Sequence, residues 1–171
     1  MKKIMLIDGG PRKTMNLAKM FEAFEKGARS VSDEIEVGHA RLYDLDFKGC
    51  RSYMVCKLKG KPVDVCAIKD GATEVLQKTV YADGVCFGSP IYYMNVTGEM
   101  RSFLERLIFP LANYKTMEYH APKKMPMAFI YTMNADEQSQ EMLKSVYDTM
   151  DFLRDGYSQS PIALRCCAPC R

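Results

Sequence analysis

The chain has 171 residues, a formal net charge of +3, 47% hydrophobic residues and 26% charged residues. This length suits one domain, residues 1–171, and this composition excludes disorder of the whole chain. No apolar run approaches the roughly 18 residues of a membrane helix, no signal peptide is evident, and the basic residues form no stripe. Seven cysteines, an odd number in a domain of this size, fit a reducing compartment. We therefore expect a cytoplasmic protein with no membrane or nucleic-acid partner.

Short apolar strands alternate with amphipathic helices along the chain. Asn16 is placed to cap the first helix, and Asp70 the second. The predicted strands cover residues 3–8, 34–43, 84–87, 126–133 and 161–167, and the predicted helices cover 17–31, 70–80, 97–111 and 138–153. Such alternation predicts an α/β fold, a doubly wound parallel five-stranded sheet of order 2-1-3-4-5. No helix is predicted after the last strand.

Ligands of such sheets bind outside the carboxyl ends of strands one and three, where the winding of the chain reverses. Residues 9–16 follow the first strand and read Gly-Gly-Pro-Arg-Lys-Thr-Met-Asn. Free N–H groups at the start of the next helix, with Arg12 and Lys13, favour a phosphate monoester, although the sequence matches neither nucleotide fingerprint. The alternative is a tight turn whose charged side chains are only solvated.

Residues 88–98, after the third strand, place two adjacent tyrosines at the same end of the sheet. An apolar patch with Tyr92 and Tyr93, rimmed by Ser89, Asn95 and Thr97, suits stacking on a flat heterocycle. The alternative is that both tyrosines pack on neighbouring helices or at a subunit interface.

At this point the chain resembles a known family, the flavodoxin-like NAD(P)H-dependent FMN reductases and their iron–sulfur flavoprotein relatives. The resemblance rests on residues 9–16, similar to G-S-P-R-K-x-x-N-T, on residues 82–92, and on residues 96–107. It implies FMN as cofactor and NAD(P)H as co-substrate, with Arg12, Lys13 and Asn16 around the phosphate. It also implies a homodimer with Tyr92 and Tyr93 near the interface. The candidate cofactor-binding residues are Gly10, Pro11, Arg12, Lys13, Asn16, Leu17, Ser89, Pro90, Ile91, Tyr92, Tyr93, Asn95, Gly98, Thr132 and Met133.

Two positions depart from the family pattern. Gly10 stands where the family has Ser, and Leu17 where it has Thr. Each lost hydroxyl removes a hydrogen bond to phosphate, worth about 1 kcal/mol. Because backbone amides remain, we expect FMN binding that is weakened rather than abolished.

The cysteines resemble a cluster motif of the iron–sulfur relatives, C-x2-C-x2-C with a fourth Cys beyond. Position 53 is Tyr, so Cys50, Cys56 and Cys66 supply three thiolates where a cubane cluster takes four. We expect no iron–sulfur cluster, and structural zinc also lacks its usual C-x2-C pair. Redox-active thiols activated by neighbouring lysines, and plain structural thiols, both remain open. The nearby lysines are Lys57, Lys59 and Lys61, and the role of Cys166, Cys167 and Cys170 is open.

The predicted function is FMN-dependent oxidoreduction, in which a nicotinamide reduces the flavin and electrons pass to a quinone, nitro compound, metal or flavin. Because the cofactor does the chemistry, no residue is assigned as catalytic acid or base, and His39 and His120 have no expected catalytic role. One alternative is a flavodoxin-type electron carrier without NAD(P)H turnover, which the slightly positive charge disfavours. Another is a cofactor-free relative acting as a subunit. A phosphoacceptor module is disfavoured because Gly88 and Ser89, not Asp, end the third strand.

Overall fold

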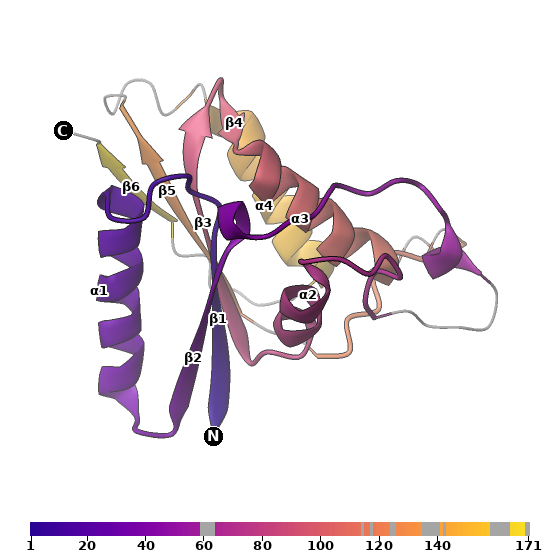
Figure 1. The fold of residues 1–171 in the computed structure, drawn as a ribbon, viewed down its shortest axis with the longest axis horizontal. Coiled ribbons are helices and arrows are strands. Elements are labelled where there is room, and N and C mark those ends of the chain that lie inside the picture. Colours follow the sequence, from indigo (N-terminus) through magenta and orange to yellow (C-terminus); the bar gives the residue numbers. More distant parts are fainter. Residues whose placement is uncertain are drawn as a thin grey trace.

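The computed structural model describes residues 1–58, 64–113, 115–116, 118–123, 126–134, 141, 143–157 and 165–169. Its centre is a parallel sheet in the order β2-β1-β3-β5-β6, which confirms the predicted order of five strands (Figure 1). These strands are β1 (Lys2–Asp8), β2 (Ile35–Arg41), β3 (Gly84–Tyr92), β5 (Met127–Met133) and β6 (Arg165–Pro169). A two-residue strand, β4 (Asn95–Val96), pairs antiparallel with the end of β3.

Helices cover both faces of the sheet. They are α1 (Asn16–Val31), α2 (Thr73–Val80), α3 (Gly98–Ile108) and α4 (Lys144–Tyr157), with short 3-10 turns at Leu42–Asp44, Val55–Lys57 and Phe109–Leu111. Figure 1 shows α1 on one side of the sheet and α2, α3 and α4 on the other. Each helix lies in sequence between two strands of the parallel sheet. Parallel strands need such a crossover connection, which is almost always right-handed.

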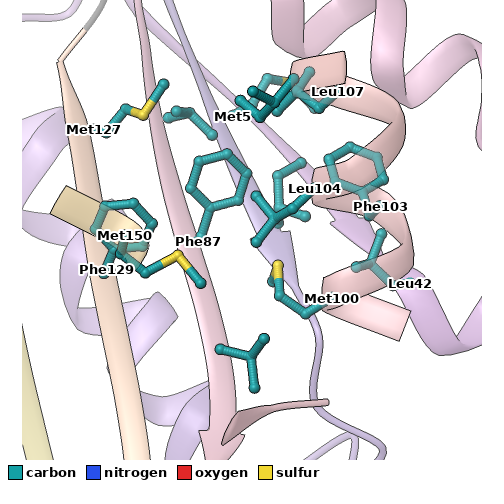
Figure 2. Close-up of a cluster of buried hydrophobic side chains, with 14 of the residues drawn as sticks. Met5, Leu42, Phe87, Met100, Phe103, Leu104, Leu107, Met127, Phe129 and Met150 are labelled. Carbon is teal, nitrogen blue, oxygen red and sulfur yellow. The ribbon is translucent and has the colours of Figure 1, made fainter. Parts of the chain in front are cut away.

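The core forms two layers because successive strand side chains point to opposite faces. On the α1 face, Leu6 and Cys86 pack with Leu17 and Phe21 of the helix. The other face is larger and holds Phe87 against α3, as Figure 2 shows. Residues of both layers are almost fully buried, so these contacts fix the carboxyl ends of β1 and β3 side by side.

The third strand and the segment after it differ from the prediction. The sequence indicated that the strand ends near residue 87, whereas β3 continues to Tyr92 and turns back into β4. Pro90 suggested a strand end, but it lies in register with Thr132 of β5 and continues the strand. The expected loop is therefore a rigid hairpin.

Several smaller boundaries also shift. β2 is shorter than the predicted 34–43, and α1 begins at Asn16 itself, so Met15 and not Asn16 is the N-cap residue. The fifth strand is confirmed at Arg165–Pro169, and the predicted residues 161–164 and 138–140 lie outside the described part. In the described part of the chain, no helix has both the length and the hydropathy needed to cross a bilayer.

Candidate functional site

The two predicted segments, residues 9–17 and 89–98, meet at one end of the sheet. The Gly9 N–H donates to the Gly88 carbonyl (2.8 Å), and the Thr97 hydroxyl donates to the Gly9 carbonyl (2.8 Å). The Thr97 N–H in turn donates to the Ser89 hydroxyl (3.0 Å). Because these bonds are buried, the bases of the two segments form one rigid unit.

The first segment, residues 10–16, which we call the phosphate loop, leads into a helix start without a side-chain cap. The N-cap residue Met15 makes no side-chain cap bond, and the first turn of α1 holds no acidic residue. Pro11, Arg12 and Lys13 are exposed around this helix start, and Asn16 is half-buried. Uncapped N–H groups and two basic side chains suit an anion.

A chain of alternating charges lies at the base of the phosphate loop. The Asp8 carboxylate accepts from the Gly10 N–H (2.7 Å) and from Arg41 (2.7 Å), and Arg41 lies 3.3 Å from Asp44. Asp44 in turn pairs with Lys13 at 3.5 Å. Burial raises the pKa of Asp8, while the Gly10 N–H and Arg41 oppose that rise.

Sequence reasoning missed Asp8 and Arg41 as residues of the site. They end β1 and β2, and the strand register places them directly opposite each other. Charged residues at the carboxyl ends of two strands could have indicated residues of the site. That Asp8 and Arg41 pair with each other, however, follows only from the register of β1 and β2, because the two residues are 33 positions apart in the sequence.

Gly10 and Leu17, the two departures from the family pattern, are in mutual contact. A Cβ atom added at Gly10 lies 2.9 Å from Cδ2 of Leu17 and 3.0 Å from Oδ1 of Asp8. Leu17 is buried with Phe21 in the core and also approaches Gly88, so it is a packing residue of α1. A serine at position 10 would therefore require Leu17 or Asp8 to shift.

The second segment, residues 89–98, forms the β3–β4 hairpin. Tyr92 pairs with Asn95, and Tyr93 and Met94 are the two turn residues, with φ of 48° and 61°. Positive φ at both turn positions matches a type I′ turn, which usually carries Asn and Gly. Tyr93 is 103% exposed and Tyr92 46% exposed, so the hairpin presents two rings to the surface.

The remaining predicted site residues divide into exposed and buried groups. Asn95 and Gly98 are exposed, and Pro90 and Ile91 are half-buried beside the tyrosines. Ser89, Thr132 and Met133 are at least nine-tenths buried. The Ser89 hydroxyl bonds within the hairpin base, and Met133 packs in the core below α3 and α4.

One further tyrosine joins this end of the molecule. Tyr43 follows β2, and burial together with a hydrogen bond to Glu99 raises its pKa to about 12. The same environment includes Tyr92. Tyr43 therefore belongs to the same surface as the hairpin, whereas the sequence placed it only at the end of the predicted strand 34–43.

The cysteine loop, residues 45–70, is held to α3 by a buried arginine. Arg106 donates to the carbonyls of Lys48 (3.1 Å) and Ile68 (3.0 Å) and pairs with Asp70 at 2.5 Å. Its side chain is fully buried, so it links both ends of the loop. Asp70 also accepts from the Ala72 N–H, so it supports the start of α2 from a position ahead of the N-cap.

A lysine joins the loop to the turn that directly follows α3. Lys57 donates to the carbonyls of Phe109 and Ala112 and lies 4.4 Å from the centroid of the Phe109 ring. Burial raises the pKa of the neighbouring Cys56 despite the opposing charge of Lys57. At Cys56 the raised pKa favours the structural alternative over a thiol activated by Lys57, and Lys59 and Lys61 lie outside the described residues.

The donor set of this loop does not fit a four-cysteine iron–sulfur cluster. Cys50, Cys56 and Cys66 are half-buried free thiols, and an exposed tyrosine, Tyr53, stands at the second cysteine position of the motif. Cys86 is buried on the α1 face of the sheet, away from the loop. Within the described ranges, no group of three or more His, Cys, Asp or Glu residues is placed to hold a metal ion. Cys166 and Cys167 lie on β6, at the opposite edge of the sheet from β2, and Cys170 lies outside the described residues.

His39 has a partner that its sequence position did not reveal. Its Nε2 lies 2.6 Å from a carboxylate oxygen of Glu25 on α1. Both side chains are on the surface of the β2–α1 side, away from the hairpin, so we still assign them no catalytic role.

The fold and the two joined segments define a flavodoxin-like α/β protein whose candidate ligand site lies at the carboxyl ends of β1 and β3. The family model for NADPH-dependent FMN reductases matches residues 2–158, so the chain belongs to this oxidoreductase family. An iron–sulfur flavoprotein of Archaeoglobus fulgidus is 31% identical over 62% of this chain, and the chain spans about half the length of that relative, 46%.

The chain is also similar to two other proteins. An iron–sulfur flavoprotein of Clostridioides difficile is 26% identical over 93% of this chain and 70% of its own length. The crystal structure of an azoreductase from Bacillus anthracis superposes with a TM-score of 0.72 at 14% identity, covering 98% of this chain and 86% of that one. The last comparison supports the fold alone.

Proposed function

We propose that the chain binds FMN between the phosphate loop and the β3–β4 hairpin and passes electrons from NAD(P)H to a small acceptor. One observation supports the proposal most strongly. At one end of the sheet, the segment that leads into α1 is hydrogen-bonded to a hairpin that exposes two tyrosines, and the start of α1 has no side-chain cap and is flanked by basic residues. A phosphate and a flat ring are the two ends of FMN. The family to which the chain belongs supports the same cofactor.

The phosphate loop fits the phosphate end of FMN. The first-turn N–H groups of α1 lack a side-chain cap, and Arg12 and Lys13 are exposed beside them. In this proposal these groups and Asn16 hold the phosphate, whereas the buried Leu17 supports the loop from below.

The hairpin fits the ring end. Tyr92, Ile91 and Asn95 border the proposed ring position, and the bond between Thr97 and Gly9 fixes the hairpin relative to the phosphate loop. A rigid wall orients the ring without rearrangement of the protein on binding. Bound FMN would supply the hydride-accepting chemistry, so the residues need only bind and orient it and leave one ring face accessible.

We propose a small electron acceptor that approaches the same surface as the nicotinamide. A quinone, nitro compound, metal ion or free flavin meets this description, and the exposed tyrosines suit a flat aromatic molecule. The net charge of +3 argues against a carrier that docks basic partners through an acidic surface.

Anaerobic mixing of the FMN-loaded chain with NADH or NADPH tests this proposal. We expect the flavin absorbance to bleach on mixing and to recover when a quinone is added. A chain that binds FMN but is not bleached by either nicotinamide would instead be an electron carrier. A chain that binds no FMN would contradict the proposal itself.

We further propose that two copies of the chain associate through the hairpin. Tyr93 and Met94 are exposed large side chains at its tip, where an interface would bury them. Sedimentation of the wild type at several concentrations should give a dimer, and Tyr93→Ser should shift it toward monomer. A wild type that sediments as a monomer at all concentrations would exclude this arrangement.

A further inference from the structure

The phosphate end of the proposed flavin site contains an anion of its own. The Asp8 carboxylate ends β1, directly below the phosphate loop, and its side chain is only 8% exposed. Its Oδ1 takes the Gly10 N–H, and its Oδ2 takes Arg41. One loop amide and the half-buried Arg41 guanidinium are therefore already bonded to a carboxylate.

This carboxylate lies beside the position at which the family pattern has a hydroxyl. A Cβ at Gly10 would lie 3.0 Å from Oδ1 of Asp8, so the space of a serine side chain adjoins the carboxylate and Leu17. A hydroxyl donates to phosphate, whereas a carboxylate repels it and competes for the same donors.

The surrounding cations do not restore the lost attraction. Arg41 is shared between Asp8 and Asp44, and Lys13 pairs with Asp44 as well. These four side chains carry two positive and two negative charges, so their formal sum is zero. Arg12 and the helix start, together with Lys13 whose charge is partly offset by Asp44, are left to attract the phosphate.

We infer that the buried Asp8 carboxylate makes this site weakly selective for the phosphate group, so that riboflavin binds nearly as tightly as FMN. The inference rests on the proposed function, since it presupposes that the site binds flavin. It extends the substrate class to flavins without phosphate. The hairpin contacts with the ring are the same for both ligands and supply most of the affinity.

Titration of the chain with FMN and with riboflavin, followed by quenching of flavin fluorescence at pH about 8 where Asp8 is ionised, tests the inference. The wild type should bind FMN less than about tenfold more tightly than riboflavin. Asp8→Asn keeps an acceptor for the Gly10 N–H and frees Arg41, so it should raise this ratio by at least about tenfold, with riboflavin affinity unchanged. Glu36→Gln, the same charge change at an exposed position of β2, should leave the ratio as in the wild type.

The outcomes separate the two proposals. A wild-type preference for FMN well above tenfold, or an unchanged ratio in Asp8→Asn with riboflavin still bound, would overturn the inference and leave the proposed function standing. Failure of the wild type to bind either flavin would overturn the proposed function. The wild-type ratio decides the question even where Asp8→Asn does not fold.

Discussion

Gly10 and Leu17, the two departures from the family pattern, depend on each other because their positions are in contact. The leucine occupies the space that a serine at position 10 would need, and it packs in the core under Gly88. Restoring the family's serine at position 10 alone therefore creates a clash with Leu17, and replacing Leu17 alone by the smaller threonine leaves a cavity.

A double-mutant cycle measures this coupling. Gly10→Ser should lower the free energy of unfolding by about 1–3 kcal/mol, because its Cβ meets Leu17 and Asp8. In a Leu17→Ala background, itself destabilised by about 2–5 kcal/mol, the cost of Gly10→Ser should fall by at least about 0.5 kcal/mol. Urea denaturation supplies all four values. Strictly additive costs would mean that the two positions are independent.

At the scale of elements, the β3–β4 hairpin is held in an unfavourable backbone conformation. Tyr93 and Met94 have positive φ, which costs non-glycine residues energy that the surrounding contacts must offset. Such strain is common where function requires a particular side chain. We attribute the retention of both large side chains to the ligand or partner surface that they form.

Met94→Gly tests that attribution. Glycine adopts the φ of 61° freely, so the substitution should raise the free energy of unfolding by about 1 kcal/mol and weaken FMN binding. Val31→Gly, at the exposed last residue of α1 with ordinary backbone, should instead lower stability slightly. Denaturation and flavin titration on the same samples report both effects. Lower stability in Met94→Gly would show that the turn stores no strain.

The cysteine loop is held by protein contacts rather than by a complete cluster motif. Arg106 and Lys57 join it to α3 and the turn that follows, while position 53 supplies no thiol. A cysteine introduced at position 53 therefore tests whether the number of cysteine ligands alone decides whether the loop binds an iron–sulfur cluster.

Tyr53→Cys completes the C-x2-C-x2-C spacing at an exposed position. After anaerobic reconstitution with iron and sulfide, the variant should retain about four iron atoms per chain, and the wild type should retain far less. Val31→Cys, which adds an exposed thiol at the end of α1, away from the loop, should behave like the wild type. Iron and sulfide analysis gives the answer. A wild type with a full cluster, or a Tyr53→Cys variant without one, would contradict the donor-set account.

At the scale of the whole molecule, the end of the sheet opposite the site is tied by Asp83. Its carboxylate accepts from the Lys3 N–H (2.8 Å) and pairs with Lys2 and Lys123. The hydrogen bond from Lys123, followed by that from Lys3, holds the pKa of Asp83 well below its ordinary value of 3.8.

A lowered pKa in the folded state means that Asp83 stabilises the fold above pH 3.8, and that this contribution is lost as the pH falls further. Asp83→Asn should therefore lower the melting temperature at pH 7, and the difference from the wild type should shrink as the pH falls below 3.8. Thermal unfolding of both proteins across this range checks the sign. A difference that grows toward low pH would contradict it.

Much of the fold follows from local patterns, and the details of the site do not. The continuous apolar run at residues 4–7 predicts β1, because a strand that is covered on both faces is apolar at every position. Apolar residues at spacings of three and four along residues 17–31 predict α1, because a helix that packs on a sheet buries only one stripe. The hairpin turn was missed because Tyr93 and Met94 lack the usual turn residues. The Asp8–Arg41 and Arg106–Asp70 pairs were missed because they join residues far apart in sequence.

The central claim is that the phosphate loop and the β3–β4 hairpin together form one flavin site. A crystal structure of the chain soaked with FMN tests it most directly. We predict density for the phosphate at the start of α1, beside Arg12 and Asn16, and density for the ring beside Tyr92. FMN bound elsewhere, or no bound flavin when the soaked chain is folded and both segments are free of lattice contacts, would contradict the claim.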